Sequence, residues 1–133
     1  MIRIVLDTNV VVSAMLNSSG TAADVLRLAL SRHVHLYVSD AILEEYEDVL
    51  RRPKFRRPSR VVASLMKAIR ATAEKVEPTE TLTVSADEAD NRFLECTKAA
   101  GAGYIVTGNR QHFPDTLGRT RIISPRQLVE LVT

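Results

Sequence analysis

Short apolar runs alternate along the chain with longer stretches in which apolar residues recur every three or four positions. The short runs are rich in β-branched residues and predict buried parallel strands at residues 2–6, 35–38, 103–107 and 121–123. The longer stretches, with their expected caps, predict amphipathic helices at residues 10–16, 21–32, 39–52, 59–75, 85–100 and 124–132. Alternation of strands and helices is typical of a parallel sheet with helices on both faces. The pattern therefore predicts an α/β fold.

Polar residues mark where these helices are expected to begin. The expected N-caps are Thr21, Ser39, Ser59, Ser85 and Ser124. Residues 85–88 predict a capping box. Pro53 is expected to end the helix of residues 39–52. Residues 81–84 are compatible with a short strand or an extended loop.

Composition excludes several classes of protein. The 133 residues, 45% hydrophobic and 26% charged, are enough to bury a core as a single domain, residues 1–133, without disulfides. The lone cysteine, Cys96, excludes an internal disulfide and a multi-cysteine zinc site. No apolar run approaches the roughly 20 residues of a membrane helix, and the apolar start of the chain is too short for a signal peptide. We therefore expect a cytoplasmic protein with no membrane association.

Positive charge is concentrated in one segment, although the net charge is only +2. Residues 51–60 hold six cations and no acid: Arg51, Arg52, Lys54, Arg56, Arg57 and Arg60. Of the 18 cations in the chain 14 are Arg, whose planar fork suits phosphate, although genome composition accounts for such an excess equally well. The segment is either an ordinary solvated loop or a phosphate-binding edge in which Phe55 can stack on a base.

Asp7 directly follows the first apolar run, at the carboxyl end of a predicted strand. Ligands of α/β proteins bind outside the carboxyl ends of the strands, which favours a functional acid. The alternative is that Asp7 caps the next helix through the amides of Asn9 and Val10. If it is functional, the Asn9 amide lies close enough to orient the carboxylate or a ligand water.

Asp90 stands out when residues 86–100 are projected as a helix. It falls within the apolar stripe that holds Phe93 and Thr97, whereas Glu88, Asn91 and Glu95 fall on the opposite side. A carboxylate on a core-facing stripe is costly unless a metal, an arginine or backbone donors pair with it. Asp87 lies at the edge of the stripe, where an acid in the first turn also favours the helix dipole.

The same projection separates two acids of the helix after Ser39. Glu44 points away from the apolar face, and Glu45 lies at its border and can reach inward. Asp7, Glu45 and Asp90 can therefore converge at one end of the sheet, where their like charges would repel. A bound cation relieves this repulsion, and all-oxygen ligation suits Mg²⁺ or Mn²⁺. Thr107 and Asn109 follow another strand and would lie beside Asp7 if the two strands are neighbours.

Four segments in this order resemble the PIN-domain family, and most closely its VapC-like branch of toxins from toxin–antitoxin systems. They are residues 5–10 (VLDTNV), 39–45 (SDAILEE), 87–94 (DEADNRFL) and 105–109 (IVTGN). The run from Thr107 to Pro114 is similar to that branch in particular, and the resemblance covers nearly the whole chain.

The resemblance implies a small three-layer α/β/α sandwich and a ribonuclease that depends on Mg²⁺ or Mn²⁺. Asp7 and Asp90 would hold the metal, and Glu45 would ligate it or take a proton from the attacking water. The supporting polar residues would be Asn9, Ser39, Asp87, Thr107 and Asn109, and the RNA-binding cations Arg51, Arg52, Lys54, Arg56 and Arg57. The implied partners are RNA, a cognate antitoxin and a second copy of the chain.

One position departs from the family pattern and keeps alternatives open. Many members carry a fourth acid where this chain has Asn109, for which Asp87 or Asp115 could substitute. A PIN scaffold that binds RNA or a protein without cutting therefore stays an alternative. A phosphatase of the haloacid-dehalogenase type would need a second acid where Asn9 stands, and a receiver domain would need adjacent acids and a late lysine, which are not evident.

Overall fold

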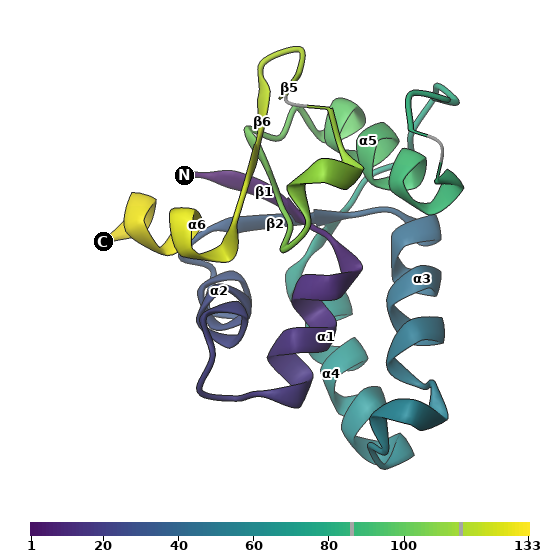
Figure 1. Cartoon of the computed structure of the whole chain (residues 1–133), viewed down its shortest axis with the longest axis vertical. Helices are drawn as coiled ribbons and strands as arrows, with labels where there is room; N and C mark the ends of the chain where they lie inside the picture. Colours follow the sequence, from purple (N-terminus) through teal and green to yellow (C-terminus); the bar gives the residue numbers. More distant parts are fainter. Residues whose placement is uncertain (86, 115) are drawn as a thin grey trace.

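The computed structural model describes residues 1–85, 87–114 and 116–133 (Figure 1); Ala86, within the predicted capping box, and Asp115, named above, lie outside them. Within the described residues, six strands form a sheet in the order β3-β2-β1-β4-β6-β5. The strands are β1 (Arg3–Leu6), β2 (His35–Val38), β3 (Glu74–Lys75), β4 (Tyr104–Val106), β5 (Thr116–Leu117) and β6 (Thr120–Ile123). All neighbours pair in parallel except β5, which runs antiparallel to β6. The predicted α/β fold with a small parallel sheet is confirmed.

Helices cover both faces of this sheet. They are α1 (Thr8–Leu16), α2 (Thr21–Leu30), α3 (Asp40–Leu50), α4 (Ser59–Thr72), α5 (Glu88–Ala100) and α6 (Pro125–Val132), with the short 3-10 helices η1 (Pro53–Phe55) and η2 (Arg110–His112). Helix α5 packs against β1, β2 and β4, and Figure 1 shows it on one side of the sheet with α1, α2 and α4 on the other. In the part of the chain that the structure describes, no helix is long and apolar enough to cross a membrane.

The central strands β1 and β4 place the candidate site. Apart from the first residue of each strand, their side chains are fully buried, as expected of parallel strands covered on both faces. Leu6 pairs with Val106, and the next residue, Asp7, donates its backbone N–H to Val106 O at 2.9 Å. Thr107 continues β4 in the same way by donating to Ile123 O at 2.9 Å. Asp7 and Thr107 therefore leave the sheet at neighbouring points of one edge.

Two helices begin one residue earlier than predicted. Thr21 and Ser59 are the first residues of α2 and α4, and their N-caps are Gly20 and Pro58. Instead of capping a helix, the Ser59 hydroxyl accepts a hydrogen bond from Arg51 Nη1 at 2.8 Å.

Helix α5 begins later than predicted. Its N-cap is Asp87, whose carboxylate accepts from Ala89 N at 2.9 Å, rather than Ser85. The Ser85 hydroxyl accepts from Asp87 N at 3.2 Å, which makes a turn ahead of the helix. The other serine caps are confirmed, at Ser39 and Ser124.

The buried surface of α5 is wider than its apolar stripe. Asn91 and Glu95, predicted to face solvent with Glu88, are only 0% and 8% exposed. Residues 81–84, which form an extended loop and not a strand, lie across this side of the helix. Glu95 Oε2 accepts the backbone N–H of Leu82 at 2.8 Å. The helical projection was wrong for Asn91 and Glu95 because a loop covers them. Polar side chains can be buried there since they form hydrogen bonds with the backbone of that loop.

Candidate active site

A cavity of about 360 Å³ opens at the carboxyl edge of the sheet, among α1, α3 and α5. Four carboxylates line it: Asp7, Glu45, Asp87 and Asp90. The other lining residues are Thr8, Asn9, Val12, Ser13, Val49, Arg52, Phe55, Ala89 and Phe93. We call this cavity the acidic groove. The three acids expected to converge thus share one cavity, and Asp87 joins them.

Asp7 lines the acidic groove and is only 6% exposed. It occupies the N-cap position of α1, but its side chain makes no capping hydrogen bond, so the capping alternative is wrong. Its Oδ2 instead accepts from Thr107 Oγ1 at 2.7 Å. Thr107 Oγ1 in turn accepts from Asn109 N at 3.0 Å. The Thr107 hydroxyl thus donates its hydrogen to Asp7 and accepts one hydrogen bond from the backbone, which orients the hydroxyl toward the Asp7 carboxylate.

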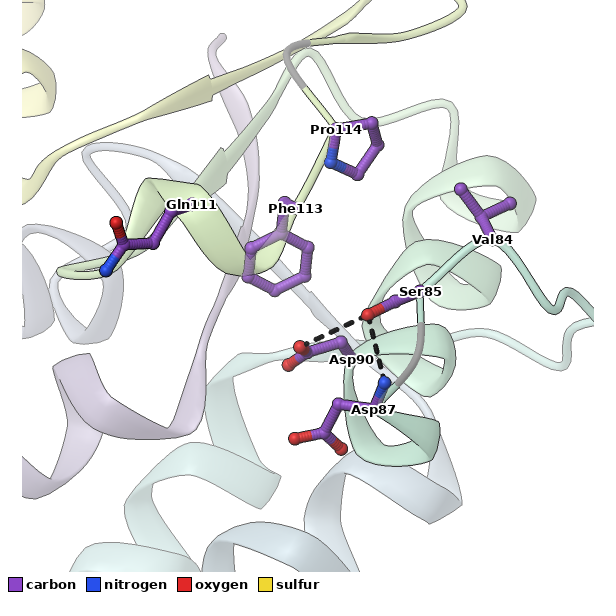
Figure 2. Close-up of a pocket in the computed structure, with 7 residues that line it drawn as sticks. All are labelled: Val84, Ser85, Asp87, Asp90, Gln111, Phe113 and Pro114. Atoms are coloured by element: carbon purple, nitrogen blue, oxygen red, sulfur yellow. Dashed lines mark hydrogen bonds between the residues drawn. The ribbon is translucent and has the colours of Figure 1, made fainter.

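Asp90 lines the same groove from the first turn of α5 and is also 6% exposed. Its Oδ2 lies 3.5 Å from the Ser85 hydroxyl, and Figure 2 shows Ser85 beside both Asp87 and Asp90. The expectation of a buried, core-facing acid at this position is confirmed. Asp87, on the turn before it, is exposed and combines its capping role with a place in the groove.

Asn91 fastens this turn to α5, although its sequence position predicted a solvent-facing residue. Its Oδ1 accepts from Ser85 N at 2.8 Å, and its Nδ2 donates to Ser85 O at 3.0 Å. The same Nδ2 lies 3.2 Å from Glu88 Oε1. Asn91 pairs with the backbone of Ser85 much as a neighbouring strand would, so it sets where the Asp87–Asp90 turn lies.

Helix α3 carries Glu45 into the groove, and Tyr46 anchors that helix. The buried Tyr46 hydroxyl donates to Leu6 O, directly before Asp7, and its ring packs against Phe93 at a centroid distance of 6.3 Å. Burial holds the Tyr46 pKa well above its ordinary value, so the hydroxyl keeps its proton. Glu45 is half-buried and Glu44 is exposed, as predicted.

The electrostatics of Glu45 reflect the concentration of acids. Burial raises its pKa above the ordinary value of 4.5; Arg52 opposes this shift, and Asp48, Asp87 and Asp7 add to it. A cation bound among these side chains would favour their charged forms.

The basic segment is divided by the structure. Of its six cations, all within the described residues, Arg52 is the one that lines the acidic groove, beside Phe55. Arg51 pairs with Glu47 (Nε–Oε2 3.1 Å) and donates to Ser59. Arg57 Nη2 donates to Leu16 O at 3.4 Å. The remaining cations lie on the surface: Lys54, Arg56 and Arg60, with Lys54 Nζ 5.2 Å from the centroid of the Phe55 ring.

The structure places the supporting residues differently. Asn9 lines the groove, and its Oδ1 accepts from Gly108 N at 3.2 Å, which ties the start of α1 to the turn after β4. Thr107 contacts Asp7 directly, and Asn109 reaches it only through its hydrogen bond to the Thr107 hydroxyl. Ser39 is not brought here: it caps α3 and lines a different cavity with Asp40 and residues 76–81.

The donors in the groove fit an oxygen-ligated divalent cation. Beside the carboxylates lies Thr8 Oγ1, a buried hydroxyl with no hydrogen-bond partner among the described residues. The sequence marks Thr8 only by its place next to Asp7. Such oxygen donors suit Mg²⁺ and Mn²⁺. Within the described chain no group of three His, Cys, Asp or Glu residues could hold a metal ion as it stands, so the fit lies in donor chemistry and location.

Comparisons with known proteins agree with this arrangement. A family model for the PIN domain matches residues 3–111, which include all four acids. An uncharacterized protein of Methanocaldococcus jannaschii is 29% identical over 112 residues, 82% of this chain and 72% of that protein. The crystal structure of VapBC2 from Rickettsia felis, bound to a promoter DNA fragment, contains a chain of the same fold. The TM-score is 0.61 at 13% identity, with 92% of this chain and 98% of that chain covered.

Proposed function

The chain belongs to the PIN domain family of nucleases, and from that premise we propose that it hydrolyses RNA phosphodiester bonds with a bound Mg²⁺ or Mn²⁺ ion. One observation carries the proposal: four carboxylates from three separate segments line a groove that also holds Arg52 and Phe55. Acids that hold a cation beside an arginine that binds phosphate are the parts that metal-assisted phosphodiester hydrolysis requires.

Each residue then has a role that its position supports. Asp7, Glu45 and Asp90 would hold the cation, which when bound lowers the pKa of a water ligand and screens charge on the phosphate. Thr107 keeps Asp7 oriented, and Glu45, the most accessible of the three, would ligate the cation or take a proton from the attacking water. Arg52 binds a phosphate next to the scissile one, and Phe55 stacks on a base.

We also infer two protein partners. The likeness to a chain of VapBC2, a complex, supports a cognate antitoxin as one of them. Homodimerisation follows from the family resemblance and has no residue assigned to it.

The direct test is titration of the metal-free protein with Mn²⁺ by calorimetry, together with cleavage of a labelled RNA. We expect binding at neutral pH, cleavage with Mn²⁺ and none with a chelator. Affinity should fall as the pH drops through the raised pKa of Glu45, because protons compete with the metal for the carboxylate. The metal-free protein should show the opposite trend and lose stability as the pH rises through that value, since the native state holds the proton more tightly.

The matched variant for this titration is Glu45→Gln, which should bind Mn²⁺ more weakly and with less dependence on pH. RNA binding without cleavage, together with no heat from Mn²⁺, would instead support the non-catalytic scaffold.

Adjacent arginines give the sharpest test of the RNA-binding groove. Arg52→Gln should weaken RNA binding and lower the slope of log affinity against log salt by about 0.7, the loss of one phosphate contact on a single strand. Arg51→Gln is the control, because Arg51 is engaged by Glu47 and Ser59 outside the groove. Equal effects of the two variants would show that the segment acts as a diffuse basic surface.

A further inference from the structure

The N-terminus of α1 carries hydrogen-bond donors for which the helix itself has no acceptor. Thr8 and Asn9 are the first two residues of α1, and both line the acidic groove. Val10 N donates to Asp7 O at 3.0 Å, but the N–H groups of Thr8 and Asn9 come before this bond and have no acceptor within the helix. The Asp7 side chain makes no capping hydrogen bond to them. The positive end of α1 therefore suits an acceptor from outside the helix.

The Thr8 hydroxyl is a further donor at the same place. Thr8 is only 8% exposed, and its Oγ1 is buried with no hydrogen-bond partner among the described residues. A buried hydroxyl without a partner destabilises the native state, which indicates that it serves a ligand. Because it makes no hydrogen bond, it can turn about its Cα–Cβ bond toward the groove without losing one. This hydroxyl alone suits a cation or an anion, since it can accept as well as donate.

The side chain of Asn9 favours the anion. Its Oδ1 accepts from Gly108 N at 3.2 Å, and only the oxygen of the amide can meet a backbone N–H. The end of the amide that is left for a ligand is therefore Nδ2, which carries two N–H donors and no acceptor. Donors from Asn9, Thr8 and the helix end together are the groups that bind phosphate oxygens at helix N-termini.

We propose that the start of α1 binds a non-bridging oxygen of the phosphate that is cut, through the Thr8 hydroxyl, Asn9 Nδ2 and the first N–H groups of the helix. We call this group of donors the oxyanion site. The inference rests on the proposed function and gives the groove a second kind of catalytic group beside its acids. Donors that are fixed in advance stabilise the negative charge that grows on such an oxygen during hydrolysis.

The four carboxylates of the acidic groove make this site depend on the cation. Without a cation the acids repel a phosphate, and with a cation bound the two ligands attract each other across a short distance. Such coupling is reciprocal, so phosphate should raise the affinity for Mn²⁺ by the same factor as Mn²⁺ raises the affinity for phosphate.

The test is titration of inorganic phosphate, by calorimetry, into the protein saturated with Mn²⁺ and into the protein in chelator. The wild type should bind phosphate with Mn²⁺ and not in chelator. Thr8→Val keeps the shape of the side chain without its hydroxyl, and should weaken phosphate binding about ten-fold, as loss of a hydrogen bond to a charged group does. Its kcat for RNA cleavage should fall at least as much, while its Mn²⁺ affinity and its melting temperature without metal should not fall. Thr8→Ser should retain phosphate binding.

Asn9→Asp separates the two kinds of ligand most sharply. The carboxylate can still accept from Gly108 N, but it replaces two donors with a negative charge. Phosphate binding should be lost, whereas Mn²⁺ affinity should equal or exceed that of the wild type.

The matched control is Thr120→Val, because the buried Thr120 hydroxyl donates to Ala102 O at 2.7 Å, outside the groove. This variant should have a lower melting temperature and unchanged affinities for Mn²⁺ and phosphate. The oxyanion site is overturned, with the proposed function intact, if the Mn²⁺-loaded wild type binds no phosphate or if Thr8→Val and Asn9→Asp bind it as the wild type does. Weaker Mn²⁺ binding by Thr8→Val also overturns it, since the hydroxyl then serves the cation. If the wild type binds neither Mn²⁺ nor RNA, the proposed function and the oxyanion site fail together.

Discussion

Asp7→Asn is expected to lower RNA cleavage at least about 100-fold and, at the same time, to raise the thermal stability of the metal-free protein. The loss follows because an amide carries no charge to hold the cation, and losing one group that stabilises a transition state commonly costs this much. The gain follows because the substitution removes a buried negative charge next to other acids. The amide oxygen can still accept the hydrogen bond of Thr107, so the fold around it should be kept.

The opposite signs of the two effects separate a functional acid from a structural one. Melting temperatures with and without Mn²⁺ should show that the metal stabilises the wild type and not Asp7→Asn, since only a ligand bound to the native state shifts the transition. Asp90→Asn should behave in the same way. Glu44→Gln is the control, because this exposed acid lies outside the groove. Unchanged cleavage in both aspartate variants would remove them from the site.

Asn91→Ala is expected to lower the free energy of unfolding by about 2–3 kcal/mol. The substitution removes a fully buried side chain that makes three hydrogen bonds, and the backbone N–H of Ser85 loses the bond that it donates to Asn91 Oδ1. It should also weaken Mn²⁺ binding about ten-fold, since the turn that carries Asp87 and Asp90 loses its attachment to α5. Calorimetry well below the melting temperature measures the second effect separately from the first.

Leu128→Ala is the matched control for that experiment. Leu128 is fully buried on α6, outside the acidic groove, and its truncation should cost a comparable 2–5 kcal/mol. Mn²⁺ affinity of the folded control should equal that of the wild type. If both variants weaken metal binding to the same extent, the effect is one of general stability, and Asn91 has no positioning role.

Much of the fold could be predicted because its central strands are continuous apolar runs. β1 and β4 are buried on both faces, so burial alone identifies them. β3 and β5 have two residues each, too few for any period to appear, and the pairing partners decide whether such segments become strands. The antiparallel β5–β6 hairpin was missed for this reason.

The site was predictable where a charged residue contradicted its surroundings. Asp7 ends an apolar strand and Asp90 interrupts an apolar stripe, so each stands out in the sequence. Asn91 does not, because a polar residue on the polar side of a helix is unremarkable until a loop is known to cover it. Nor could the sequence show that Arg52 lines the groove and Arg51 does not, because the two residues are adjacent and of the same type.

The hydrogen bond between Asp7 and Thr107 joins residues 100 positions apart. During synthesis, β1 and β2 can leave the ribosome long before β4, which must then insert beside β1 at the centre of the sheet. Contacts so distant in sequence form late and slowly. A nascent chain therefore carries an Asp7 that Thr107 does not yet orient, and the acidic groove takes its final form only after β4 and Thr107 have been synthesised.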